Sequence, residues 1–152
     1  MYSKAEAAQL RQAFWTTFGQ YMAPVPSAEG ETINWINYRT GLKHVQLRMR
    51  TEERRASIGL ELTHPDADLR ALHYEQLQAL QAMLPAVPAS AWEWQPEAEE
   101  NGQLLSRVHQ ELRGVSPLNR DDWPALISFF KPRLLALDEF WSQARYPLED
   151  LM

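Results

Sequence analysis

The residues from 121 to 145 constrain the fold most, because they carry the most hydrophobic helical pattern of the chain. Apolar side chains recur there in steps of four and three, which places them on one side of a helix. They are Trp123, Ile127, Phe130, Leu134, Leu137 and Trp141. Such a stripe is wide enough to close a core, so we expect the rest of the chain to pack on it. Asp121 or Asp122 is predicted to cap this helix, and Pro132 to bend it without ending it.

Length and composition favour one soluble domain, which we place at residues 3–145 with a short C-terminal tail at 146–152. A chain of 152 residues, 45% of them hydrophobic, can bury a core without metal or disulfide support. The absence of cysteine excludes disulfides, thiolate metal ligands and a cysteine nucleophile, and it favours a reducing compartment. The N-terminal residues hold no apolar run of the length that a signal peptide or a membrane span needs. We therefore expect a cytoplasmic protein with no membrane partner.

Two further helices are indicated by their caps. Ser3 and Glu6 have the spacing of a capping box, which opens a helix that stops by Pro24. Asp66 is expected to cap a second helix, over residues 67–84.

Five strands are predicted between and after these helices. They cover residues 33–38, 44–50, 55–62, 91–95 and 104–112. The second and third alternate apolar and polar residues, and a four-residue loop at 51–54 would place Met49 opposite Ala56. The element order is αβββαββα. The fold class is therefore α+β, with a five-stranded, mostly antiparallel sheet whose helices pack on one face and whose other face is polar.

The polar face of this sheet is the main candidate for a binding site. Three arginines of the second and third strands point to it, and the last strand adds two further residues: Arg48, Arg50, Arg55, Arg107 and His109. The predicted register puts Arg50 opposite Arg55, which is unfavourable unless an anion lies between them. The face could then bind phosphate groups of a nucleic acid or an acidic protein surface, or it could simply be solvated.

The distribution of charged residues indicates a local basic patch on a protein that is acidic as a whole. The segment 38–55 contains six basic and two acidic residues, a formal charge of +4, whereas the whole chain carries −5. This balance argues against a nucleic-acid binder that relies on bulk electrostatics, and it leaves a confined basic surface as the alternative.

The tryptophans give a second candidate surface. Trp92 and Trp94 share one face of their strand, where they would form a stacking surface or a contact between two copies in a homodimer. Trp35 is compatible with either face of its strand.

No catalytic, metal or cofactor site is predicted. Pro65 and Asp66 match the first half of the PD…(D/E)xK nuclease pattern, but no downstream acidic residue has a lysine two positions later. The spacing of His64, Asp66 and His73 does not suit a metal site on one helix. We expect Asp66 to act as a helix cap.

Several blocks of the sequence resemble a known family. They are LRQAFWTTFGQYMAPVPSAEG, INWINYRTG, ELTH before Asp66, AWEWQ and DDWPALISFFKPRLLALDEFW. Together they resemble the bacterial family known as domain of unknown function 4268, from about Ser3 to Arg145. That family has no assigned activity. Some longer relatives look like fusions to an upstream restriction-endonuclease-like domain, which the resemblance implies would place this domain near nucleic acid.

The sequence thus predicts a small non-enzymatic interaction module whose arginine-bearing sheet face meets a nucleic acid or a protein. The alternative is a nuclease-associated enzyme that acts on a phosphodiester or another anionic substrate.

Overall fold

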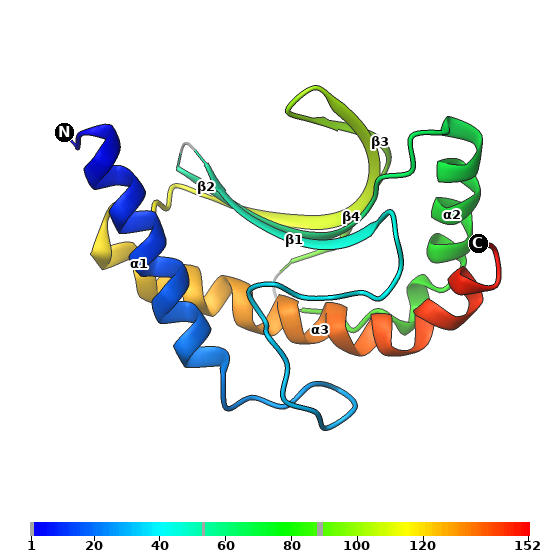
Figure 1. Ribbon diagram of the computed structural model, residues 1–152, viewed down its shortest axis with the longest axis horizontal. Helices are drawn as coiled ribbons and strands as arrows, with labels where there is room; N and C mark the ends of the chain where they lie inside the picture. Colours follow the sequence, from blue (N-terminus) through cyan, green and yellow to red (C-terminus); the bar gives the residue numbers. More distant parts are fainter. Residues whose placement is uncertain (1, 53, 88–89) are drawn as a thin grey trace.

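The computed structural model describes residues 2–52, 54–87 and 90–152, and within them it shows an α+β fold (Figure 1). The α-helices are α1 (Lys4–Met22), α2 (Ala67–Ala79) and α3 (Trp123–Glu149). The strands are β1 (Val45–Glu52), β2 (Arg55–Leu62), β3 (Glu93–Glu100) and β4 (Gln103–Arg113), and the short 3-10 helices are η1 (Gln81–Met83) and η2 (Arg120–Asp122). No helix among these residues is long and apolar enough to cross a membrane.

The four described strands form one antiparallel sheet in the order β1-β2-β4-β3. Figure 1 shows that this sheet is curved and that α3 runs along its convex side, with α1 crossing at one end. α2 lies at the other end, beside β3 and β4. The helices therefore cover one face of the sheet, as predicted, and leave its concave face open.

The core lies between the convex face and α3. Phe130, Leu134 and Leu137 of the predicted stripe are fully buried, and Trp123 and Trp141 are nearly so. Aromatic rings of α1 meet this stripe, since the Phe18 ring lies 5.8 Å from that of Phe130. The prediction that α3 organises the core is confirmed.

The last helix differs from its prediction at both ends. It continues through Pro132, as expected, but it runs to Glu149, so only residues 150–152 lie beyond it. Asp122 is the N-cap residue of α3, as predicted, but its carboxylate does not cap the helix and accepts instead from the Ser116 N–H at 3.0 Å. Asn119 caps η2 through the Asp121 N–H. The Asp122 carboxylate thus anchors the preceding loop.

Residues 33–38 do not form a strand, although their composition favours one. The Asn34 side chain accepts from the backbone N–H groups of Ile36 and Asn37 at 3.1 and 3.0 Å, and this turn competes with strand pairing. Trp35 points into the core and donates its indole N–H to the Val25 carbonyl at 2.9 Å. The described sheet therefore has four strands and not five.

The predicted β1–β2 register was wrong by two residues. Met49 lies opposite Ile58, and pairing continues to Glu52 opposite Arg55, so the predicted loop at 51–54 is shortened to 53 and 54. Glu53 lies outside the described residues. Because the shift is two residues, every side chain keeps its predicted face.

The β3–β4 hairpin is longer than expected. β3 begins at Glu93 and extends through PEAEE to Glu100, with a register shift between Gln95 and Ala98 that accommodates Pro96. Asn101 and Gly102 make its turn with positive φ angles of 51° and 79°, as their sequence predicts.

Candidate functional site on the concave sheet face

The polar side chains of the concave face lie in rows that cross the sheet. One row is Gln46, Glu61, Arg107 and Gln95, and the next is Arg48, Gly59, His109 and Glu93. A third row joins Arg50, Ser57 and Glu111, and a fourth joins Glu52, Arg55 and Arg113. The predicted residues Arg48, Arg50, Arg55, Arg107 and His109 therefore share one face, which we call the concave face.

Arg50 is held by Glu61. The two side chains form a bidentate ion pair, in which Nη2 lies 3.0 Å from Oε1 and Nη1 contacts Oε2. Glu61 is only 2% exposed, and its hydrogen bond with Arg50 raises the pKa of that guanidinium. Arg50 does not lie opposite Arg55, so the predicted clash between two arginines does not occur.

Gly59 is required where the strands approach most closely. It separates Ser57 from Glu61 on the concave face, so no side chain blocks the path of Arg50 to Glu61. A Cβ atom at this position would lie 2.4 Å from the Val108 carbonyl oxygen. Glycine therefore permits both the β2–β4 spacing and the ion pair.

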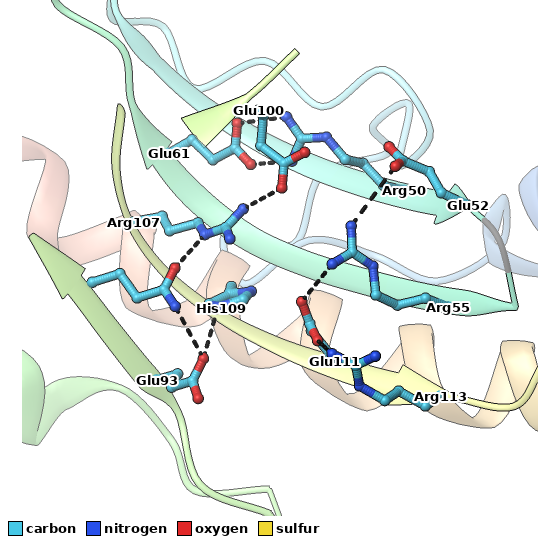
Figure 2. Close-up of polar contacts among 11 residues, drawn as sticks. Arg50, Glu52, Arg55, Glu61, Glu93, Glu100, Arg107, His109, Glu111 and Arg113 are labelled. Atoms are coloured by element: carbon cyan, nitrogen blue, oxygen red, sulfur yellow. Dashed lines mark hydrogen bonds and ion pairs between the residues drawn. The ribbon is translucent and has the colours of Figure 1, made fainter. Parts of the chain in front are cut away.

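Arg107 links β4 to the far end of β3. Its Nε donates to Gln95 Oε1 and its Nη1 to Glu100 Oε1, both at 2.8 Å, and it is 8% exposed. Figure 2 shows Glu100 reaching over the sheet toward Arg50 and Glu61. Burial raises the pKa of Glu100, but the hydrogen bond with Arg107 and the charges of Arg50 and Arg107 outweigh it, so the pKa is lowered. The curl of the hairpin thus buries this end of the concave face.

His109 is buried next to a more exposed carboxylate. Its Nε2 lies 2.9 Å from Glu93 Oε2, and only 2% of His109 is exposed, against 67% of the Glu93 side chain. Burial and the charge of Arg107 lower the pKa of His109 despite Glu93. Burial therefore favours the neutral imidazole over the charged one.

Arg55 lies in a looser pair at the other end of the face. It is 3.1 Å from Glu111 and 3.7 Å from Glu52, and Glu111 also contacts Arg113 at 3.5 Å (Figure 2). Arg48, in contrast, is exposed and forms no ion pair within the described residues.

The formal charges of the concave face sum to zero when histidine is counted as neutral. It carries five arginines and five glutamates: Arg48, Arg50, Arg55, Arg107 and Arg113, and Glu52, Glu61, Glu93, Glu100 and Glu111. The sequence pattern could place Glu111 of β4 on this face, but nothing local indicated that it would pair with Arg55, or that Glu93 and Glu100 of β3 would lie there. The sheet order brings them there.

Trp92 and Trp94 do not lie on this face. Trp94 lies opposite the buried Val108 and meets the Tyr74 ring edge-on at 6.1 Å. Trp92 donates its indole N–H to the Pro85 carbonyl at 3.0 Å, and both tryptophans are half-buried against the core. Their stacking role stays a prediction.

With this geometry in place, comparison with known proteins assigns a family. A family model described as Domain of unknown function (DUF4268) matches residues 10–145. The chain belongs to this family. No curated protein and no solved structure gave a match. The match to DUF4268 spans all four described strands, and hence every charged residue of the concave face.

The outer edge of β1 is a second feature of this DUF4268 domain, and sequence reasoning missed it. Val45 turns its backbone groups away from β2, since its N–H donates to the Leu42 carbonyl and its carbonyl accepts from Thr40 Oγ1. Backbone directions alternate along an antiparallel strand, so Leu47, Met49 and Thr51 point the same way. Their backbone groups have no partner on that side in the part of the chain that the structure describes.

A hollow of about 390 Å³ lies beside this edge. Its lining includes Trp15 of α1, Ile36 of the preceding loop, and Leu47, Arg48 and Met49 of β1. The hollow therefore offers apolar side chains next to outward-facing backbone groups of β1 and next to Arg48, which forms no ion pair with any residue that the structure describes.

A larger hollow, of about 470 Å³, lies between the 27–39 segment and α3. Asp138, 5% exposed, accepts there from the Tyr38 hydroxyl at 2.5 Å and from the Ala28 N–H at 2.7 Å. Burial and this hydrogen bond raise the pKa of Tyr38. These contacts span 100 and 110 residues, and they fasten the loop to the helix.

Proposed function

We propose that this protein is a non-enzymatic interaction module that binds a partner protein through the concave face. The observation that carries the proposal is the balance of charge on that face: Arg50, Arg55 and Arg107 each contact a glutamate. Binding to a phosphate backbone depends on cations that are free to replace counterions. Mixed charges that alternate in sign suit a protein surface better, because such surfaces recognise each other through complementary charges.

The arrangement of these side chains also favours binding without large ordering costs. The buried pairs fix the rotamers of long side chains before any partner arrives, so less conformational entropy is lost on association. Arg48 and Glu93 then remain as the accessible charges at the two ends of one row. Arg48 and Glu93 are separated by three strand spacings, about 14 Å measured across the strands. A partner would place an acidic and a basic residue at that separation.

A selection experiment tests this proposal. A displayed library of random peptides would be selected on the wild-type protein, and the selected peptides would be measured against Arg48→Glu and Glu93→Lys. Each reversal should weaken binding about tenfold or more, because it replaces an attraction by a repulsion. The exposed Arg11 of α1 provides the control, since Arg11→Glu makes the same change of charge away from the face.

Nucleic acid is the competing class of partner, and oligonucleotide binding by the wild-type protein and an Arg48 variant distinguishes the two classes. Fluorescence anisotropy of labelled single- and double-stranded oligonucleotides should show no salt-sensitive binding. Binding that weakens steeply with salt and is reduced in Arg48→Ala would contradict a protein-binding role for this face.

A further inference from the structure

The two edges of the sheet differ in how they are protected. β3 carries Pro96, a register shift beside it, and the charged residues Glu97 and Glu99. Proline, bulges and charges are the devices by which proteins prevent a sheet edge from pairing with another chain. β1 has eight residues, no proline and no register shift, and its charged residues Arg48, Arg50 and Glu52 all lie on the concave face. Its edge is the one left open.

The open edge presents a repeating set of backbone groups. Leu47, Met49 and Thr51 direct an N–H and a carbonyl outward, as the bonds of Val45 on the same side establish. The outward groups of one residue lie about 6.6 Å from those of the next, which is the length of two residues in an extended chain. An extended peptide laid along this edge could therefore bond to all three residues.

We propose that the β1 edge binds an extended segment of a partner protein by antiparallel strand addition, and that this segment alternates apolar and acidic residues. Its apolar side chains would lie on the core side, against Trp15 and Met49 in the hollow beside the edge. Its acidic side chains would lie on the concave side next to Arg48. The inference rests on the proposed protein-binding function and names the chemistry of the partner.

Charge argues against a second copy of this chain as the occupant. Antiparallel pairing of two β1 strands that uses all three outward-facing residues sets Met49 opposite itself. Arg48 then lies opposite Arg50 of the second copy, on the same face. Like charges directly opposite each other destabilise a strand pair, whereas a glutamate in the added strand would stabilise it.

Synthetic peptides test the inference. An eight-residue fluorescent peptide alternating valine and glutamate should bind about tenfold or more tightly than the valine and lysine counterpart. In the proposed pairing the valines lie opposite residues 47, 49 and 51 and exchange hydrogen bonds with them. N-methylation of two valines should therefore abolish binding, while N-methylation of two glutamates, whose N–H groups face away, should leave it unchanged.

Two protein variants complete the test. Arg48→Glu should reverse the preference toward the lysine peptide. Met49→Pro removes both an outward N–H and the Met49 side chain that lines the hollow, and it leaves the β1–β2 bonds in place, as proline on a strand edge does. It should therefore lose peptide binding while the circular dichroism spectrum stays that of wild type, and Met49→Ala, which keeps the N–H, should retain part of that binding.

The outcomes separate this inference from the proposed function. Equal binding of the two peptides, or binding that survives valine N-methylation, overturns strand addition at β1. If library peptides still depend on Arg48 and Glu93 in that case, the concave face remains the binding site. Strand addition by a partner segment would also be overturned by a dimer, seen in sedimentation equilibrium, that Met49→Pro dissociates. The β1 edge would then bind a second copy of this chain.

Discussion

Truncation of Glu61 should destabilise this protein more than loss of any exposed charge on the concave face. Glu61→Ala leaves the Arg50 guanidinium without its bidentate partner, at a place where the two side chains are 3% and 14% exposed. Breaking a buried pair costs about 3–5 kcal/mol. Arg50 keeps some water contact and the nearby charge of Glu100, so we expect the free energy of unfolding to fall by about 2–4 kcal/mol.

The measurement is urea denaturation followed by circular dichroism, for Glu61→Ala, Arg50→Ala and the double variant. The cycle should give a coupling energy of about 2 kcal/mol, because each single variant removes the same ion pair and leaves its other member unpaired. Arg55→Ala is the matched control: its side chain is 28% exposed and its pairs are longer, so its loss should cost less than about 1 kcal/mol.

One result would refute this reasoning. If Glu61→Ala and Arg55→Ala lower the free energy of unfolding equally, with unchanged m values, the Arg50–Glu61 pair is not a buried, pre-organised contact. The proposed function would then lose its physical basis.

Three further predictions concern stability. Gly59→Ala should cost about 3 kcal/mol in urea denaturation, since the new Cβ atom must push β2 away from the Val108 carbonyl; a loss below about 1 kcal/mol would contradict the close approach. Asp138→Ala should cost about 2–4 kcal/mol by leaving the Tyr38 hydroxyl buried and unpaired, and adding Tyr38→Phe should recover part of that loss. The pKa of His109 is lowered from 6.5, so the unfolded chain takes up its proton first as pH falls, and stability should decrease from about pH 6.5 downward. His109→Gln should reduce that decrease without removing it, because the pKa values of His44 and His73 are also lowered, and an unchanged profile would exclude a contribution from His109.

The elements that the sequence predicted well are those specified by neighbouring residues. Ser3 and Glu6 form their capping box because three positions separate them in any helix that starts there. The faces of β1 and β2 followed from alternation in the same way. The register did not, because alternation is unchanged by a shift of two residues. In the observed register Arg54 has a positive φ of 63°, a conformation that turns usually take from glycine or asparagine, so its sequence did not indicate a tight turn there.

The ion pairs of the concave face were predicted only in part, for a related reason. The arginines are evident from the pattern of two strands, and all of them point to the face expected. Their partners come from elsewhere: Glu111 lies 56 residues after Arg55, and Glu100 reaches Arg107 across a hairpin turn. Which glutamates meet which arginines depends on the order of strands in the sheet, β1-β2-β4-β3, which no local pattern specifies.

The contact between α1 and α3 has a consequence for synthesis of the chain. The rings of Phe18 and Phe130, 112 positions apart in sequence, pack together, and Phe14 lies 5.6 Å from Trp123. At about 5–20 residues per second, a ribosome needs roughly 6–22 s to add the intervening residues. During that interval the apolar residues of α1 have left the ribosome, but α3, which buries them in the folded protein, has not yet been made. Exposed apolar surface of this kind is prone to aggregate, so the interval before α3 leaves the exit tunnel is the stage of synthesis at which this chain is most vulnerable.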